Sequence, residues 1–175
     1  MRALVVYESM FGNTRAVAEA VAEGLAAGMP VDLVEVGTAP AGLPDEVGLL
    51  VVGGPTHAFA LTRPATRGSA QDQADRPLVS TGIGLREWLA AVRDSRAGAV
   101  AAAAFDTRVD KPRLPGSAAR GAQRRLRRHG FRIAARATSF YVTGAAPHEL
   151  VTGELDRARQ WGERLAAGLP HESRA

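Results

Sequence analysis

Short segments rich in apolar residues alternate along the chain with segments whose apolar residues recur at helical spacing. The apolar segments are short and rich in valine, as is usual for strands that are covered on both faces of a parallel sheet. We expect strands at residues 3–7, 31–36, 48–52, 99–105 and 131–142. Helical spacing predicts helices at residues 14–27, 85–92, 118–129 and 152–167. This alternation predicts an α/β fold whose parallel strands are joined by helical crossovers.

Two connections depart from the regular alternation. Residues 37–47 contain two prolines and leave room for one helical turn at most. Residues 53–84, between the third strand and the next helix, are too long for a plain connection, and long loops in compact domains are usually functional. Within this stretch we predict a further helix at residues 64–74, because proline suits the first position of a helix.

Length and composition set the limits of the interpretation. A chain of 175 residues, of which 46% are hydrophobic, fits one domain with its own core, and residues 170–175 are expected to form a short tail. The chain has no cysteine, which excludes disulfides, thiolate metal sites and cysteine nucleophiles. Its four histidines are scattered, so we expect no metal site built by the protein.

No segment of the sequence predicts export or membrane insertion. The first apolar run, residues 3–7, is far shorter than the core of a signal peptide. No apolar stretch approaches the ~20 residues that a transmembrane helix needs. The default expectation is therefore a cytoplasmic protein without a transmembrane segment.

The turn after the first strand carries the first chemical signal. Ser9, Asn13 and Thr14 supply neutral donors, and Gly12 permits a close approach or a positive φ. Such a turn leads straight into a helix, where backbone N–H groups and the helix dipole favour an anion. The segment therefore fits a phosphate cradle. It equally fits an ordinary capped loop with Asn13 or Thr14 as the N-cap.

Three segments in order resemble one known family. The first is the Ser-Met-Phe-Gly-Asn-Thr turn at 9–14, which resembles the phosphate loop of flavodoxins. The second comprises residues 53–59 and 62–67, and the third runs from residue 139 to residue 162. The amino-acid sequences of these segments are most similar to a branch of flavodoxin-domain proteins found in actinobacteria. The resemblance covers nearly the whole chain and implies a doubly wound, five-stranded parallel sheet in the order 2-1-3-4-5.

The resemblance also implies flavin mononucleotide (FMN) at the ends of strands 1, 3 and 4. Its phosphate would lie in the first turn, and its ring between the loops after strands 3 and 4, where His57 or Phe59 can stack on it. The residues expected to bind it are Ser9, Met10, Phe11, Gly12, Asn13, Thr14, Pro55, Thr56, His57, Ala58, Phe59, Asp106, Thr107 and Arg108. Alternatively, His57 and Phe59 only anchor their loop, and Asp106 caps a turn. No catalytic acid or base is expected.

Other nucleotide-binding folds fit the sequence less well. Residues 82–84 lack the third glycine of a Rossmann fingerprint and follow no strand, and the chain has no P-loop. A receiver domain would need a carboxylate where Gly53 and Gly54 stand, and a lysine after the fifth strand, whereas the only lysine is Lys111. Residues 36–38 offer no acid to bind a ribose, so FMN is expected rather than FAD or NAD.

A block of basic residues separates this chain from ordinary acidic flavodoxins. Residues 108–136 carry a net charge of +9, whereas the whole chain carries +4. Four arginines of the predicted helix share one side of it, namely Arg120, Arg124, Arg127 and Arg128. We expect this side to bind a redox partner with an acidic face, although a merely solvated surface is the alternative. Nucleic acid is an unlikely ligand, because the block lacks interleaved aromatic residues.

Three departures from the flavodoxin pattern bear on redox behaviour. No aromatic residue lies between 106 and 130, residues 58–60 lack the usual flexible glycine, and Arg108 places a positive charge beside the expected site. We therefore expect a less negative reduction potential than the family norm and little one-electron reduced form. The function favoured is an FMN-dependent redox protein, either an electron carrier or a small oxidoreductase. The alternative is a flavin-free binding or regulatory module that acts through its arginines.

Overall fold

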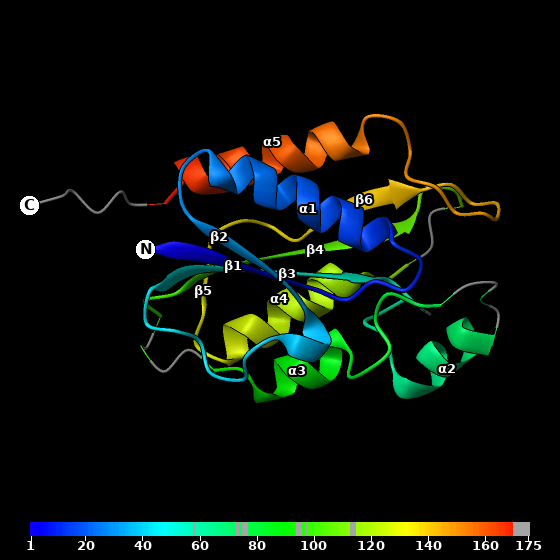
Figure 1. Ribbon diagram of the computed structural model, residues 1–175, viewed down its shortest axis with the longest axis horizontal. Helices are drawn as coiled ribbons and strands as arrows, with labels where there is room; N and C mark the ends of the chain where they lie inside the picture. Colours follow the sequence, from blue (N-terminus) through cyan, green and yellow to red (C-terminus); the bar gives the residue numbers. More distant parts are fainter. Residues whose placement is uncertain are drawn as a thin grey trace, which may run out of the picture.

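A parallel β-sheet runs through the middle of the protein, between two layers of helices (Figure 1). The structure is a computed structural model that describes residues 1–57, 59–72, 74, 77–93, 96, 98–112 and 115–169. Its strands are β1 (Arg2–Tyr7), β2 (Val31–Glu35), β3 (Val47–Pro55), β4 (Ala101–Val109), β5 (Arg132–Ile133) and β6 (Thr138–Val142). The order is β2-β1-β3-β4, and β5 and β6 both pair with β4. The predicted fold class and strand order are confirmed.

The helices cover the sheet on both faces (Figure 1). One face carries α1 (Asn13–Ala26) and α5 (Glu154–Ala167), and the other carries α3 (Leu85–Ala91) and α4 (Ala118–Arg128). A single 3₁₀ turn, η1 (Val36–Thr38), lies between β2 and β3, which confirms that this connection holds one turn at most. The helix α2 (Pro64–Asp72) follows β3 and confirms the helix predicted to begin at Pro64.

The strand predicted at residues 48–52 is longer in the structure, where β3 ends at Pro55, and two other predicted strands differ more. The strand β4 extends to Val109, past its predicted end at residue 105. It pairs with β3 as far as Thr107 and with β6 as far as Val109, whose partner in β6 is Val142. The single strand predicted at residues 131–142 is two strands. Ile133 pairs with Ala102 of β4, and Thr138 pairs with Phe105 of β4. The segment therefore contains two more residues than β4 between these pairs, and they interrupt the ladder.

The close packing of α1 against α5 depends on two glycines. A Cβ atom on Gly24 would lie 2.0 Å from the carbonyl oxygen of Arg159, and one on Gly162 would lie 2.3 Å from that of Val21. Only hydrogen fits at these positions. The sheet beneath is made of small side chains as well, since residues 101–104 of β4 are four fully buried alanines. The glycines let the backbones of α1 and α5 approach each other, and the alanines form a fully buried centre of the sheet.

Some expectations from the sequence fall outside what the structure tests. Among the described residues, no helix is long and apolar enough to cross a membrane. The cytoplasmic location stays a prediction. The predicted tail, residues 170–175, lies outside the described residues.

A matched pair of glycine substitutions tests the helix packing. Gly162→Ala should lower the free energy of unfolding, because overpacking costs about 1–3 kcal/mol and exceeds the ~1 kcal/mol gained in helix propensity. Gly68 lies in α2, and a Cβ atom at this position would meet nothing within 4 Å. Gly68→Ala should therefore raise the stability by up to ~1 kcal/mol. Urea unfolding of both variants measures the difference, and equal effects at the two positions would contradict the packing argument.

Candidate functional site

A cavity of about 420 Å³ opens at the carboxyl ends of β1, β3 and β4. This is the edge at which open parallel sheets bind ligands. Ten of the fourteen predicted binding residues line it, namely Ser9, Met10, Phe11, Asn13, Thr14, Pro55, Thr56, His57, Thr107 and Arg108. The topology therefore brings the three predicted segments together around one space.

The conformation of the turn between β1 and α1 depends on the hydroxyl group of Ser9 and on Gly12. The Ser9 Oγ atom accepts hydrogen bonds from the backbone N–H groups of Gly12 and Arg15, both at 3.2 Å. Gly12 is the N-cap of α1 and has a φ of 100°, a conformation that disfavours any residue with a Cβ. The interpretation with Asn13 or Thr14 as the N-cap is therefore wrong.

This arrangement leaves backbone donors at the start of α1 without an acceptor. Within the described part of the chain, no hydrogen bond is made by the N–H groups of Met10, Phe11, Asn13 and Thr14. All four residues line the cavity. Unpaired N–H groups at a helix N-terminus carry a partial positive charge, so this end of the cavity can bind an anion.

The side chains of this turn tie it to the neighbouring loops. The hydroxyl groups of Thr14 and Thr107 are 2.7 Å apart and hydrogen-bonded, and both residues are buried. The Asn13 side-chain amide donates to the carbonyl oxygen of His148 at 2.7 Å. The turn is thereby fixed to β4 on one side and to the loop after β6 on the other.

Asp106 does not line the cavity but lies behind its wall, fully buried. Its Oδ2 atom accepts hydrogen bonds from the Thr56 hydroxyl at 2.8 Å, the Ser117 hydroxyl at 2.6 Å and the backbone N–H of Ala119 at 3.0 Å. Ser117 is the N-cap of α4. Asp106 therefore anchors the first turn of α4 to β3, which agrees with its interpretation as a cap.

The loop after β3 forms the rim of the cavity. The backbones of His57 and Ala60 bond each other in both directions, at 2.9 and 3.0 Å, and close a tight turn. Phe59, within this turn, has a φ of 70° and is 51% exposed, so its ring is available to a ligand beside the cavity. Burial lowers the pKa of His57 below its ordinary value of 6.5, so the imidazole is neutral at pH 7. Ala58 lies outside the described residues.

The charge of the cavity wall is positive. Among the residues that the structure describes, those lining the cavity include Arg108 but neither aspartate nor glutamate. The Arg108 guanidinium donates to the carbonyl oxygen of Gly116 at 2.6 Å, which holds it beside the wall. Together with the N–H groups of the β1–α1 turn that have no acceptor in the described part of the chain, Arg108 suits the site to a ligand that carries negative charge.

Comparison with known proteins relates the chain to flavodoxins. A model of the flavodoxin family matches residues 5–88, from β1 into α3. Over the whole length, the chain resembles oxidised Flavodoxin 1 from Bacillus cereus, with a TM-score of 0.67, 14% identity and coverage of 97% of this chain and 100% of that one. The chain has a flavodoxin-like fold.

Other solved structures share this fold at low identity. A flavodoxin from the domain Archaea has a TM-score of 0.64 and 20% identity, with coverage of 95% of this chain and 97% of that chain. The rubredoxin oxygen:oxidoreductase from Desulfovibrio gigas has a TM-score of 0.62 and 16% identity, and the flavodoxin-like chain matches 35% of its length. No curated protein sequence matches the chain.

The flavodoxin-like protein has cavity residues that the sequence did not indicate. They are Thr66, Ser69, Ala70, Val109, Val142 and His148. The first three come from α2, and the length of the stretch from 53 to 84 was the one signal that a functional element lies there. The others come from the ends of β4 and β6 and from the following loop, and no local pattern marks them.

A buried carboxylate fastens α2 to the rest of the flavodoxin-like protein. Glu8, fully buried at the end of β1, accepts hydrogen bonds from the Thr62 hydroxyl and from the backbone N–H of Leu85, the latter at 2.8 Å. Arg67 of α2 donates to the Thr62 hydroxyl at 3.2 Å and to the Glu87 carboxylate at 3.1 Å. Burial raises the pKa of Glu8 above its ordinary value, against the hydrogen bonds from Thr62 and Leu85.

The raised pKa of Glu8 makes a pH-dependent prediction. Because the pKa of Glu8 is higher in the folded than in the unfolded protein, the contribution of its protonation to the free energy of unfolding is complete below about pH 4.5. This contribution is lost as the pH rises through the folded-state pKa. Glu8→Gln imitates the protonated carboxyl group, so it should keep this contribution at higher pH. The free energy of unfolding of the variant, measured in urea from about pH 4 to 8, should exceed that of the natural protein increasingly as the pH rises.

A surface carboxylate serves as the control for this measurement. Glu163 is exposed on α5, and Glu163→Gln should leave the pH profile unchanged. A Glu8→Gln variant that is less stable than the natural protein at every pH would show that the carboxylate is needed in its charged form.

Proposed function

We propose that the protein binds FMN in the cavity and acts as a redox protein, as an electron carrier or as a small oxidoreductase. The observation that carries this proposal is the set of backbone N–H groups at the start of α1 that have no acceptor among the described residues. They belong to residues that line the cavity, and the described lining holds no acidic side chain. When bound, the flavin supplies the electron or hydride chemistry, and the protein supplies binding, orientation and electrostatics.

The phosphate of FMN suits the β1–α1 turn. The N–H groups of Met10, Phe11, Asn13 and Thr14 would donate to its oxygens, and the dipole of α1 would stabilise its charge. The Ser9 hydroxyl acts indirectly, because it holds the turn by accepting hydrogen bonds from the backbone. Phosphate binding in this manner needs no cationic side chain.

The ring system suits the remainder of the cavity. Residues 55–57 and the end of β4 flank it, and the exposed ring of Phe59 can stack on a planar ligand. The neutral imidazole of His57 can donate or accept a hydrogen bond at the flavin edge. Residues of α2 form a further wall, which helps to exclude water from the bound ring.

FMN is favoured over a dinucleotide by the end of β2. A dinucleotide site would need a free carboxylate there to bind a ribose. Glu35 stands at that position, but its two oxygens accept hydrogen bonds from the backbone N–H of Gly37 at 2.7 Å and from the Ser80 hydroxyl at 2.6 Å. Both oxygens of this carboxylate are therefore committed to holding η1 and the loop before α3.

Two glycines with the same local geometry test the FMN site. Gly12 and Gly153 are the N-caps of α1 and α5, with φ of 100° and 88°, and a Cβ atom at either position would meet no other atom within 4 Å. Alanine at either position should cost about 1–2 kcal/mol of stability through backbone strain. Only Gly12→Ala should also re-aim the phosphate-binding N–H groups and weaken FMN binding at least about tenfold.

Titration of the unfolded-and-refolded, flavin-free protein with FMN, followed by the quenching of flavin fluorescence, measures these affinities. A natural protein that binds no FMN and purifies without yellow colour would support the flavin-free binding module instead. Equal FMN affinities of the Gly12→Ala and Gly153→Ala variants would place the phosphate elsewhere.

A second experiment tests the positive charge beside the cavity. A cation next to the flavin stabilises the negative charge gained on reduction, so Arg108 should make the reduction potential less negative. Arg108→Glu should therefore shift the potential to more negative values, and Arg108→Gln should shift it by less. Arg63→Glu, an exposed arginine that does not line the cavity, is the control for net charge. An unchanged potential in Arg108→Glu would remove this residue from the redox site.

A further inference from the structure

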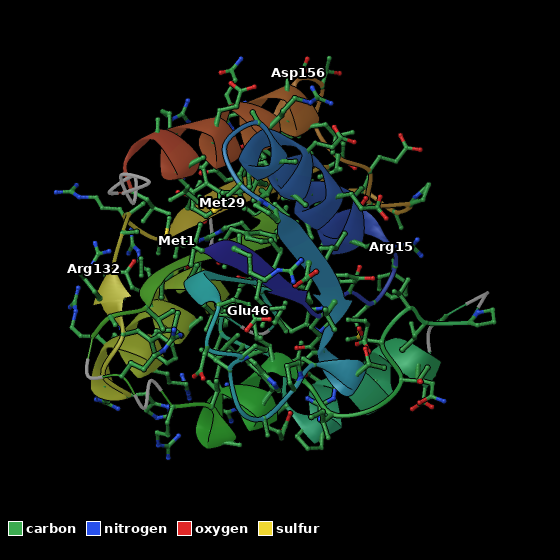
Figure 2. The ribbon with its side chains drawn as sticks, turned by 60° about the vertical axis from the view of Figure 1, so that its left-hand side comes forward. Met1, Arg15, Met29, Glu46, Arg132 and Asp156 are labelled. Carbon is green, nitrogen blue, oxygen red and sulfur yellow. The ribbon has the colours of Figure 1, made fainter. Side chains whose placement is uncertain are left out.

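The outer side of α4 presents arginine side chains to solvent. Arg120, Arg124, Arg127 and Arg128 are exposed, whereas Ala119, Ala122 and Leu126 on the opposite side are fully buried. The neighbouring strand and connection add Arg132 and Arg136, both exposed. These six arginines are called the arginine face below. Figure 2 shows Arg132 at the edge of the sheet, on the opposite side of the molecule from Arg15 of α1.

The arginine face contains a groove that the sequence did not indicate. Five residues, Arg120, Gln123, Arg124, Arg136 and Ala137, line a shallow depression of about 330 Å³ between α4 and the connection from β5 to β6. The Gln123 side-chain oxygen accepts a hydrogen bond from the backbone N–H of Ala137 at 2.6 Å and holds this connection against the helix. The groove therefore has a fixed wall on each side, and three of its five lining residues are cationic.

No acid among the described residues forms an ion pair with the arginine face. Among the residues that the structure describes, the ion pairs join Arg2, Arg15, Arg67, Arg157 and Arg159 to acids, and none includes a residue of the arginine face. The neighbouring Arg125 has a lowered pKa, first because it is partly buried and then because Arg86, Arg124 and Arg128 repel its charge. An external anion would relieve this repulsion.

The arginine face begins close to the cavity. Arg108 lines the cavity and donates to the carbonyl oxygen of Gly116, the residue directly before the N-cap of α4. Arg120 follows that N-cap by one helical turn, and its backbone N–H donates to the Ser117 hydroxyl. A partner seated on the arginine face would therefore lie beside the wall of the cavity.

We propose that the arginine face docks a carboxylate-rich surface of an acidic partner protein, with one acidic segment in the groove. Guanidinium groups bind carboxylates through paired, charge-assisted hydrogen bonds, and three arginines around one groove match a segment of several acids. Nucleic acid fits less well, because the groove lining holds no aromatic side chain on which a base could stack. That this partner exchanges electrons rests on the proposed function, whereas the docking itself does not.

A pair of variants with equal charge tests the docking. Arg120→Glu with Arg124→Glu removes two arginines of the groove, and Arg63→Glu with Arg164→Glu changes two exposed arginines outside the arginine face. Each pair lowers the formal net charge from +4 to 0. The probes are a fluorescein-labelled peptide of ten glutamates and a labelled single-stranded DNA of about the same charge. Fluorescence anisotropy reports binding at ionic strengths from about 0.01 M to 0.15 M, where the Debye length falls from about 30 to 8 Å.

The groove variant should lose at least about tenfold in affinity for the peptide at low salt, and the control pair should lose much less. In the natural protein the peptide should bind more tightly than the DNA. Equal losses in the two variants would reduce the arginine face to diffuse net charge, and tighter binding of the DNA would make it a nucleic-acid surface. Peptide binding should be the same with and without FMN and in Gly12→Ala, so a failure of the flavin site would not affect this result.

Discussion

The hydrogen bonds of the Asp106 carboxylate are the interaction on which both the cavity and the arginine face depend. The carboxylate joins β4 to β3 through the Thr56 hydroxyl, and it joins β4 to α4 through Ser117 and Ala119. The Oδ2 atom of Asp106 lies at the N-terminus of α4, where the helix dipole favours a carboxylate oxygen and three donors are already in place. One buried carboxylate thereby sets the back of the cavity and the position from which the arginine helix starts.

The fold and the N–H-rich turn at residues 9–14 could be predicted because their signals are local. Apolar runs and helical spacing mark the elements, and the turn at residues 9–14 combines its donors and its glycine within six residues. A glycine in a turn by itself indicates a possible left-handed conformation, and Gly12 adopts one. Parallel topology then brings that turn next to Thr56 and Thr107, since all three follow or end strands at the same edge of the sheet.

The remainder depended on contacts between distant residues, which no local pattern contains. The strand β4 extends past Phe105 because β6 pairs with it, and the interruption after Ile133 is visible only in the register of the two strands. Asp106 was expected at the cavity wall because the strand was predicted to end at residue 105. In the longer β4, side chains alternate between the two faces of the sheet, and the Asp106 side chain lies on the face away from the cavity. The contribution of His148 depends on how the loop after β6 folds back to meet Asn13.

The choice of basic residue on the arginine face decides which conditions can regulate it. Lys111 is the only lysine in the chain, so every other formal positive side-chain charge is a guanidinium group. Guanidinium groups stay protonated throughout the physiological pH range and are not substrates for lysine acetylation. Neither acidification nor acylation of lysine would therefore turn this field off. Dissolved ions remain able to weaken it, which makes the salt content of the surroundings the main control on its reach.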